Sequence, residues 1–173
     1  FDSEACMAAR LGDENNGFWR IAPCGDIRKT SRRYRGDTLI LETLFEGDEG
    51  KILLVDLMPL RGDNSDIVRV LVGQEGRVTI RSVLDLRFEY GKLRPLIRRV
   101  EDREISAIAG PHGIVLRSDR ELSVEESAII GECTIAEGER ANFVLTYFPS
   151  HLDVPEPVDA AEADTYFASR ARD

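Results

Sequence analysis

Hydrophobic and polar residues largely alternate along residues 77–89. Val78, Ile80 and Leu84 belong to one row of alternate positions, and charged or polar residues such as Arg81 belong to the other. Successive side chains of a β-strand point to opposite faces, so one row faces a core and the other faces solvent. The alternation therefore predicts a half-buried strand.

Shorter runs of the same kind recur along the chain, and clusters of Gly, Asp, Asn and Pro separate them. Residues 38–46 begin apolar on both faces, which is typical of a central strand. About ten short strands with tight turns predict an all-β fold, a two-sheet antiparallel sandwich of the large kind called a supersandwich. The further predicted strands are residues 38–46, 51–58, 67–72, 96–101, 105–109, 113–117, 127–135 and 140–148.

A short helix is predicted at each end of the chain. Ser3 suits the N-cap of a helix over residues 3–11. Near the C-terminus, three prolines mark a linker, and Asp159 has the spacing of an N-cap for a helix over residues 160–170. The predicted division is a β-sandwich domain of residues 1–149, followed by a Pro-rich linker and helix of residues 150–173.

Composition excludes several classes of protein. The chain has 173 residues, 42% of them hydrophobic and 32% charged, so it is neither disordered nor embedded in a membrane. Its net charge of −9 argues against nucleic acid or an anionic membrane as a partner. One basic stretch, residues 28–35, is interpreted as a solvated strand face; a patch for an anion or an acidic partner is the alternative.

The 3 cysteines indicate the cellular compartment in which the chain is found. Their odd number and the absence of a Cys-x-x-Cys pair favour a reduced chain, so we expect a cytoplasmic location. Cys6, Cys24 and Cys133 are interpreted as small, buried or half-buried apolar residues. Because the chain begins at Phe1, we expect its natural N-terminus to lie further upstream.

The chain shows no arrangement typical of an active site. His112 and His151 lie in separate loops, and neither a nucleophile elbow nor a phosphate-binding glycine motif occurs. The adjacent carboxylates Glu125 and Glu126 would point to opposite sides of a strand, so they make a poor acid/base pair. We predict no catalytic, cofactor-binding or metal-binding residue. Trp19 is interpreted as a core residue or as a contact with another domain.

Seven stretches, taken together and in order, carry a resemblance to a known family. They are residues 1–3, 17–23, 34–43, 55–59, 86–91, 109–111, and 143–147 leading to 149–151. This set resembles the N-terminal domain of bacterial glycoside hydrolase family 15 proteins, the glucoamylase and trehalase group. The chain departs from the family pattern at Glu4, where the family has Pro, and at Tyr166 and Phe167, where it has a Trp pair.

The resemblance implies an N-terminal β-sandwich, a linker with a helix, and then a six-fold α/α barrel. In this family, two glutamates of the barrel hydrolyse α-glucosidic bonds with inversion. The barrel would begin after Asp173, so no residue of this chain matches a catalytic glutamate.

Three hypotheses follow. In the first, the chain is the non-catalytic N-terminal domain of a glycoside hydrolase that supports the barrel and shapes the rim of the active site. Its partner is then the downstream barrel, it meets carbohydrate only indirectly, and Trp19, Tyr166 and Phe167 are its candidate interdomain contacts. In the second, it is a stand-alone carbohydrate-binding sandwich with an aromatic-lined groove. In the third, it is a homo-oligomerisation module.

Overall fold

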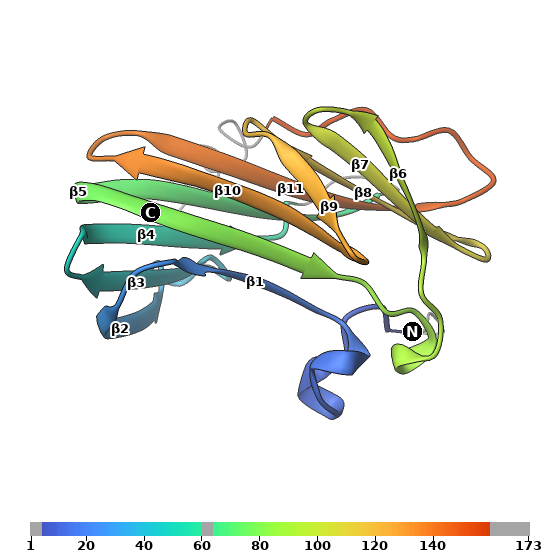
Figure 1. The fold of residues 1–173 in the computed structure, drawn as a ribbon, viewed down its shortest axis with the longest axis horizontal. Helices are drawn as coiled ribbons and strands as arrows, with labels where there is room; N and C mark the ends of the chain where they lie inside the picture. The colour runs from blue at the N-terminus through green and yellow to red at the C-terminus, as the bar shows by residue number, and fades with distance from the viewer. Residues whose placement is uncertain (1–4, 60–63, 160–173) are drawn as a thin grey trace.

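The computed structural model describes residues 5–59 and 64–159, in which eleven strands form two packed layers (Figure 1). All pairs among these strands are antiparallel, which confirms the predicted all-β sandwich. The strands are β1 (Phe18–Pro23), β2 (Ile27–Tyr34), β3 (Leu41–Gly47), β4 (Gly50–Leu57), β5 (Ser65–Asp85), β6 (Leu96–Glu101), β7 (Glu104–Ala109), β8 (His112–Ser118), β9 (Leu122–Glu125), β10 (Ala128–Ala136) and β11 (Arg140–Pro149).

Strand β5 belongs to both layers. Its first part pairs with β4 and β11 in a large sheet of order β2-β3-β4-β5-β11-β8-β7-β6. Its second part pairs with β1 and β10 in a small sheet, and β9 pairs with the far side of β10. Figure 1 shows β5 running to one end of the sandwich and returning in the nearer layer, in front of its first part.

Two glycines make the bend of β5. A Cβ on Gly73 would collide with the carbonyl oxygen of Ala136, and Gly76 has a φ of +70°. Two separate strands, residues 67–72 and 77–89, were expected here, so that prediction was wrong. Glycines let a strand bend sharply while the residues on both sides of the bend stay paired. In the sequence, such a glycine-containing bend looks the same as a turn between two strands.

The core lies between the two sheets. Its wholly buried members include Ile52, Ile80, Leu84, Ile105 and Phe143. The alternation in residues 77–85 is confirmed, because Val78, Ile80 and Leu84 all face this core. A second cluster covers the outer face of the large sheet, where Val158 of the C-terminal segment packs against it; its buried members are Ile40, Val55, Leu57, Val68, Val70 and Val144.

The N-terminal segment differs from the prediction. Among described residues 5–17, helical structure is limited to two short 3-10 turns, Ala9–Leu11 and Glu14–Asn16, where one helix over residues 3–11 was expected. The carbonyl oxygens of Ala5 and Cys6 accept hydrogen bonds from the amides of Tyr90 (3.1 Å) and Arg87 (3.0 Å), so they are not available to a helix. Long-range backbone pairing therefore overrides the local preference.

Several predicted features lie outside the described residues. These are Ser3, the helix of residues 160–170 with Tyr166 and Phe167, and the first of the seven family-like stretches. Strand β11 ends at Pro149, and the division of the chain at that point stays a prediction. None of the described helices is long and apolar enough to cross a membrane.

Candidate functional site

The two ends of the sandwich differ in construction. Tight connections lie at one end, where β3 meets β4, β5 bends and β10 meets β11; we call it the turn end. The long connections gather at the other end, which we call the loop end (Figure 1). Backbone hydrogen bonds tie them together there, for example from Ser150 N to Pro111 O (2.9 Å) and from Tyr90 N to Ala5 O (3.1 Å). The loop end comprises residues 5–17, 35–40, 58–59, 86–95, 110–111 and 150–153.

The family-like stretches meet at the loop end. Each of the six stretches within the described residues starts, ends or turns there, although they are spread from residue 17 to residue 151. The pairs Phe18–Asp85 and Leu41–Asp56 lie at this end of their sheets. The loop end is therefore our candidate functional site, and it was not foreseen as one surface.

A strained turn, formed by residues 89–91, lies at the loop end. Glu89 and Tyr90 both have positive φ, at 52° and 56°, a conformation that costs an L-residue about 1–2 kcal/mol. The neighbouring segment holds this turn, because Asn16 Nδ2 donates to Tyr90 O (2.8 Å) and a Cβ on Gly91 would collide with the Asn16 side chain. As a result the Tyr90 side chain stands 51% exposed.

His112 connects this turn to the sheet. Its ring stacks on buried Phe88, with centroids 6.1 Å apart, and its Nδ1 lies 3.0 Å from the hydroxyl of Tyr147. The histidine was expected in a surface loop, but it is half-buried between two aromatic side chains. His151 is exposed, as predicted.

Trp19 closes the gap between the sheets beside the loop end. Its indole N–H donates to Ser82 Oγ (3.0 Å), and the guanidinium of Arg69 lies over its ring, 4.7 Å from the centroid. Arg69 also donates to Trp19 O (3.0 Å) and pairs with Asp56 (2.8 Å). The side chain packs against the core, which agrees with the core interpretation of Trp19. Its role as an interdomain contact stays a prediction.

Next to this cluster, an apolar groove of about 290 Å³ opens at the loop end. Its most exposed members are Leu39, Met58 and Tyr34, at 92%, 64% and 61%. Asp56, the partner of Arg69, also lines it, so the groove adjoins the surroundings of Trp19. We call it the apolar groove.

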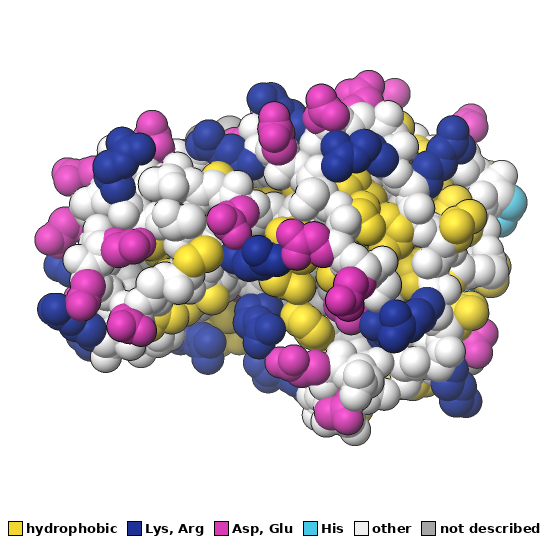
Figure 2. All heavy atoms as spheres, viewed as in Figure 1, with side chains coloured by type: hydrophobic (Ala, Val, Ile, Leu, Met, Phe, Trp, Pro, Cys, Tyr) yellow, Lys and Arg dark blue, Asp and Glu magenta, His cyan; other side chains and the backbone are white. Residues whose placement is uncertain are grey.

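Other hydrophobic side chains are exposed at the same end. In the view of Figure 2, hydrophobic side chains gather between β9 and β6 toward the loop end, whereas charged side chains surround the turn end. Exposed apolar patches of this kind mark surfaces that bind other proteins or ligands. The exposed members within the loop end are Leu11, Leu39, Met58, Tyr90, Leu93 and Leu152, and Tyr34, Leu96 and Ile108 lie in the strands next to it.

Glu42 is a buried carboxylate close to the apolar groove. It accepts hydrogen bonds from Arg33 Nε and Arg35 Nε, both at 2.8 Å. Burial by itself would raise the pKa of Glu42, but the two guanidinium groups outweigh it and hold this pKa below its ordinary value. All residues of β2 are exposed, which agrees with the interpretation of the basic stretch as a solvated strand face.

A wider groove of about 560 Å³ lies on the small sheet and is lined mainly by charged residues. Arg81 pairs there with Glu125 (2.5 Å) and Glu132 (3.1 Å). None of its lining residues is aromatic, so it lacks the stacking surface that the carbohydrate-binding hypothesis predicts.

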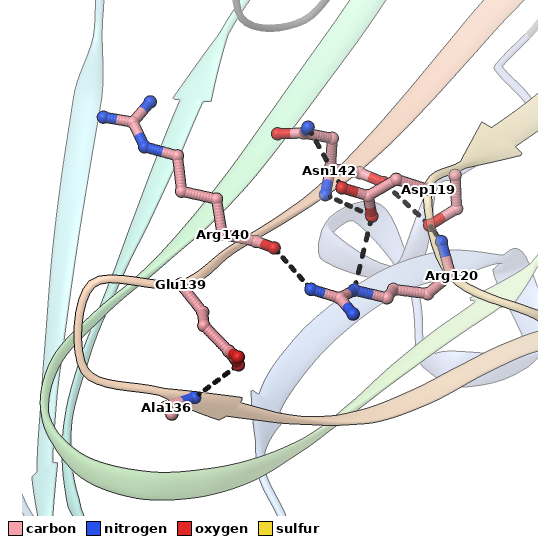
Figure 3. A network of polar contacts seen from close by, with 7 residues as sticks. Asp119, Arg120, Ala136, Glu139, Arg140 and Asn142 are labelled. Atoms are coloured by element: carbon pink, nitrogen blue, oxygen red, sulfur yellow. Dashed lines mark hydrogen bonds and ion pairs between the residues drawn. The ribbon is translucent and has the colours of Figure 1, made fainter.

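Outside the loop end, a cluster of polar contacts holds the β8–β9 connection against β11. Figure 3 shows Asp119, which accepts from Asn142 N (3.0 Å) and Nδ2 (3.2 Å), and Arg120, whose Nη2 donates to Arg140 O (2.6 Å). These contacts join the β8–β9 connection to β11. Because Asp119 is held by these donors, the cluster serves the fold rather than proton transfer.

Reactive chemistry is sparse in the part of the chain that the structure describes. No group of three or more His, Cys, Asp or Glu side chains there could hold a metal ion. The three cysteines are free. Burial raises the pKa of the Cys6 thiol, which keeps it protonated and unreactive. Cys24 is exposed, contrary to expectation, because it follows β1 with its side chain away from the core.

Comparison with known proteins agrees with the resemblance. The model of the family described as "Trehalase-like, N-terminal" matches residues 1–136. Trehalase 1 of Sulfolobus acidocaldarius is 34% identical over 102 residues, which cover 59% of this chain and 17% of that protein. A solved structure, a putative kojibiose phosphorylase from human microbiome, aligns with a TM-score of 0.46 at 11% identity, covering 89% of this chain and 25% of that one. The chain thus spans only a small part of the curated relative that it matches, and by the family match it belongs to the trehalase-like N-terminal domains.

Proposed function

We propose that this chain is the non-catalytic N-terminal domain of a glycoside hydrolase, and that its loop end supports the catalytic domain. The observation that carries the proposal is that the stretches resembling the family meet at that end, where large hydrophobic side chains such as Leu39, Met58 and Tyr90 are exposed. Exposed large hydrophobic side chains that gather at one end of a domain usually mark a surface that contacts another domain or a ligand.

The catalytic part of the proposal comes from the family. The partner domain is an α/α barrel whose two glutamates hydrolyse α-glucosidic bonds with inversion, and the name of the curated relative favours trehalose as a substrate. In this arrangement the strained turn at Tyr90 is a candidate for the rim of the active site. The free thiols are compatible with a cytoplasmic enzyme.

The test compares this chain with the full-length polypeptide on trehalose, maltose and dextrin. We expect no hydrolysis by the 173-residue chain and hydrolysis by the full-length protein. Proton NMR should show β-glucose released from the attacked ring of each substrate, and from trehalose an equal initial amount of α-glucose from the leaving ring. Full-length protein without residues 1–149 should lose activity or thermal stability.

Two results would contradict the proposal. One is hydrolysis by this chain alone, which would require an active site within it. The other is a shortened protein that keeps its full activity and melting temperature, which would mean that the domain supports nothing.

A further inference from the structure

The apolar groove is presented by an ordered turn. Leu39 lies in the β2–β3 connection, where Arg35 N donates to Ile40 O (3.0 Å) and Thr38 Oγ1 donates to Arg35 O (2.5 Å). The next residue, Ile40, is buried at 2% exposure in the outer-face cluster and anchors the turn. A leucine that is 92% exposed is thus held in place rather than left on a mobile loop.

Residues of three neighbouring strands line the groove. Leu41 and Ile67 lie at the loop end of β3 and β5, and Asp56 lies near the end of β4. Asp56 also pairs with Arg69, whose guanidinium lies over the Trp19 ring. A preformed apolar hollow of this kind loses little freedom when a partner's side chain enters it.

Charge in the groove is paired within the domain. Asp56 is the charged residue among those that line it, and it forms an ion pair with Arg69. Arg33 and Arg35, at the end of β2 and just beyond it, pair with Glu42. The surface that meets the groove should therefore present an apolar side chain.

From this geometry we infer that the apolar groove receives an apolar projection of the catalytic domain of the same polypeptide. This inference rests on the proposed function and narrows the docking surface within the loop end. The occupant is taken to be that domain because the chain belongs to a family of N-terminal domains and matches only 17% of its curated relative.

The test measures amide hydrogen exchange in this chain alone and in the full-length polypeptide. We expect the backbone amides of residues 34–41 and 56–58 to exchange at least about tenfold more slowly in the full-length protein, because docking covers them. Leu39→Glu and Met58→Glu should remove that protection and lower the melting temperature of the full-length protein. The same changes should leave the isolated chain unaffected, since both side chains are exposed.

Val100→Glu is the matched control. Val100 is 49% exposed on β6, the edge of the large sheet opposite to β2, so this change should alter neither protein. Equal effects of all three substitutions would overturn the inference, because a general response to added charge would then explain them.

The remaining outcomes separate the two proposals. Protection elsewhere on the loop end, but not at the groove, would overturn this inference and leave the proposed function standing. No protection anywhere, with activity independent of the domain, would overturn both. Protection that grows with the concentration of the isolated chain would identify a second copy as the occupant and would overturn the inference as well.

Discussion

Glu42 links the chemistry of a single residue to the stability of the domain. Its carboxylate is 7% exposed and lies between Arg33 and Arg35. The pKa of Glu42 is lower in the folded chain than in the unfolded chain, because the two guanidinium groups outweigh the effect of burial. This interaction therefore stabilises the fold above the unfolded pKa, about 4.3, and is lost as pH falls through the lower folded pKa.

Replacing Glu42 with Gln should reduce the free energy of unfolding by about 1–3 kcal/mol at pH 7, because the charge-assisted hydrogen bonds are weakened. The loss of stability between pH 5 and pH 3 should also become smaller. Denaturant unfolding at several pH values measures both effects. Glu46→Gln on the same strand is the control, since Glu46 pairs with the exposed Lys29. If the Glu42 variant and the unchanged chain lose stability in the same way as the pH falls, then Glu42 does not have the lowered pKa assigned to it.

At the scale of elements, the turn at residues 89–91 concentrates strain where the family-like stretches meet. Tyr90→Gly should raise the free energy of unfolding by up to about 1 kcal/mol, because glycine adopts positive φ without steric cost. Tyr90→Ala removes the same ring but keeps the Cβ, so it should give no gain. Thermal unfolding of both variants checks this. A glycine variant no more stable than the alanine variant would show that the turn is not strained.

The bend of β5 offers a second test at this scale. Gly76 and Gly138 both have positive φ, but a Cβ on Gly76 would collide with the carbonyl oxygen of Glu49, whereas nothing lies near Gly138. Gly138→Ala should cost about 1–2 kcal/mol from φ alone, and Gly76→Ala clearly more, because backbone must move. Equal losses in denaturant unfolding would mean that the bend can relax.

The elements also show how far the sequence could lead. Alternation located most strands, since it follows from one-sided burial, and β6 matches its predicted range fully. The bend at Gly73 and the missing helix at Ala5 were not predictable from local pattern, because both depend on partners far along the chain. The loop end was missed for the same reason: Asn16 and Tyr90, which are hydrogen-bonded to each other there, are 74 residues apart in sequence. Only the resemblance hinted that these stretches belong together.

For the whole molecule, the sharing of β5 predicts a single cooperative unfolding transition. Neither sheet can lose β5 without disrupting the other, so both should melt together. Trp19 is the single tryptophan of the chain, so its fluorescence reports on the region between the sheets. Far-ultraviolet circular dichroism reports on all strands. The two signals should give the same midpoint in urea. Separate midpoints would mean that the small sheet unfolds independently.

The edge strand β2 has a consequence for how this domain behaves when crowded. All eight of its residues are exposed, and β3 occupies one side of it only. A bare strand edge of this length invites hydrogen bonding to other chains and the growth of aggregates. Charged side chains along β2, among them Arg28, Lys29 and Arg32, would have to lose water when another strand paired with that edge. The basic stretch should therefore oppose aggregation through this edge.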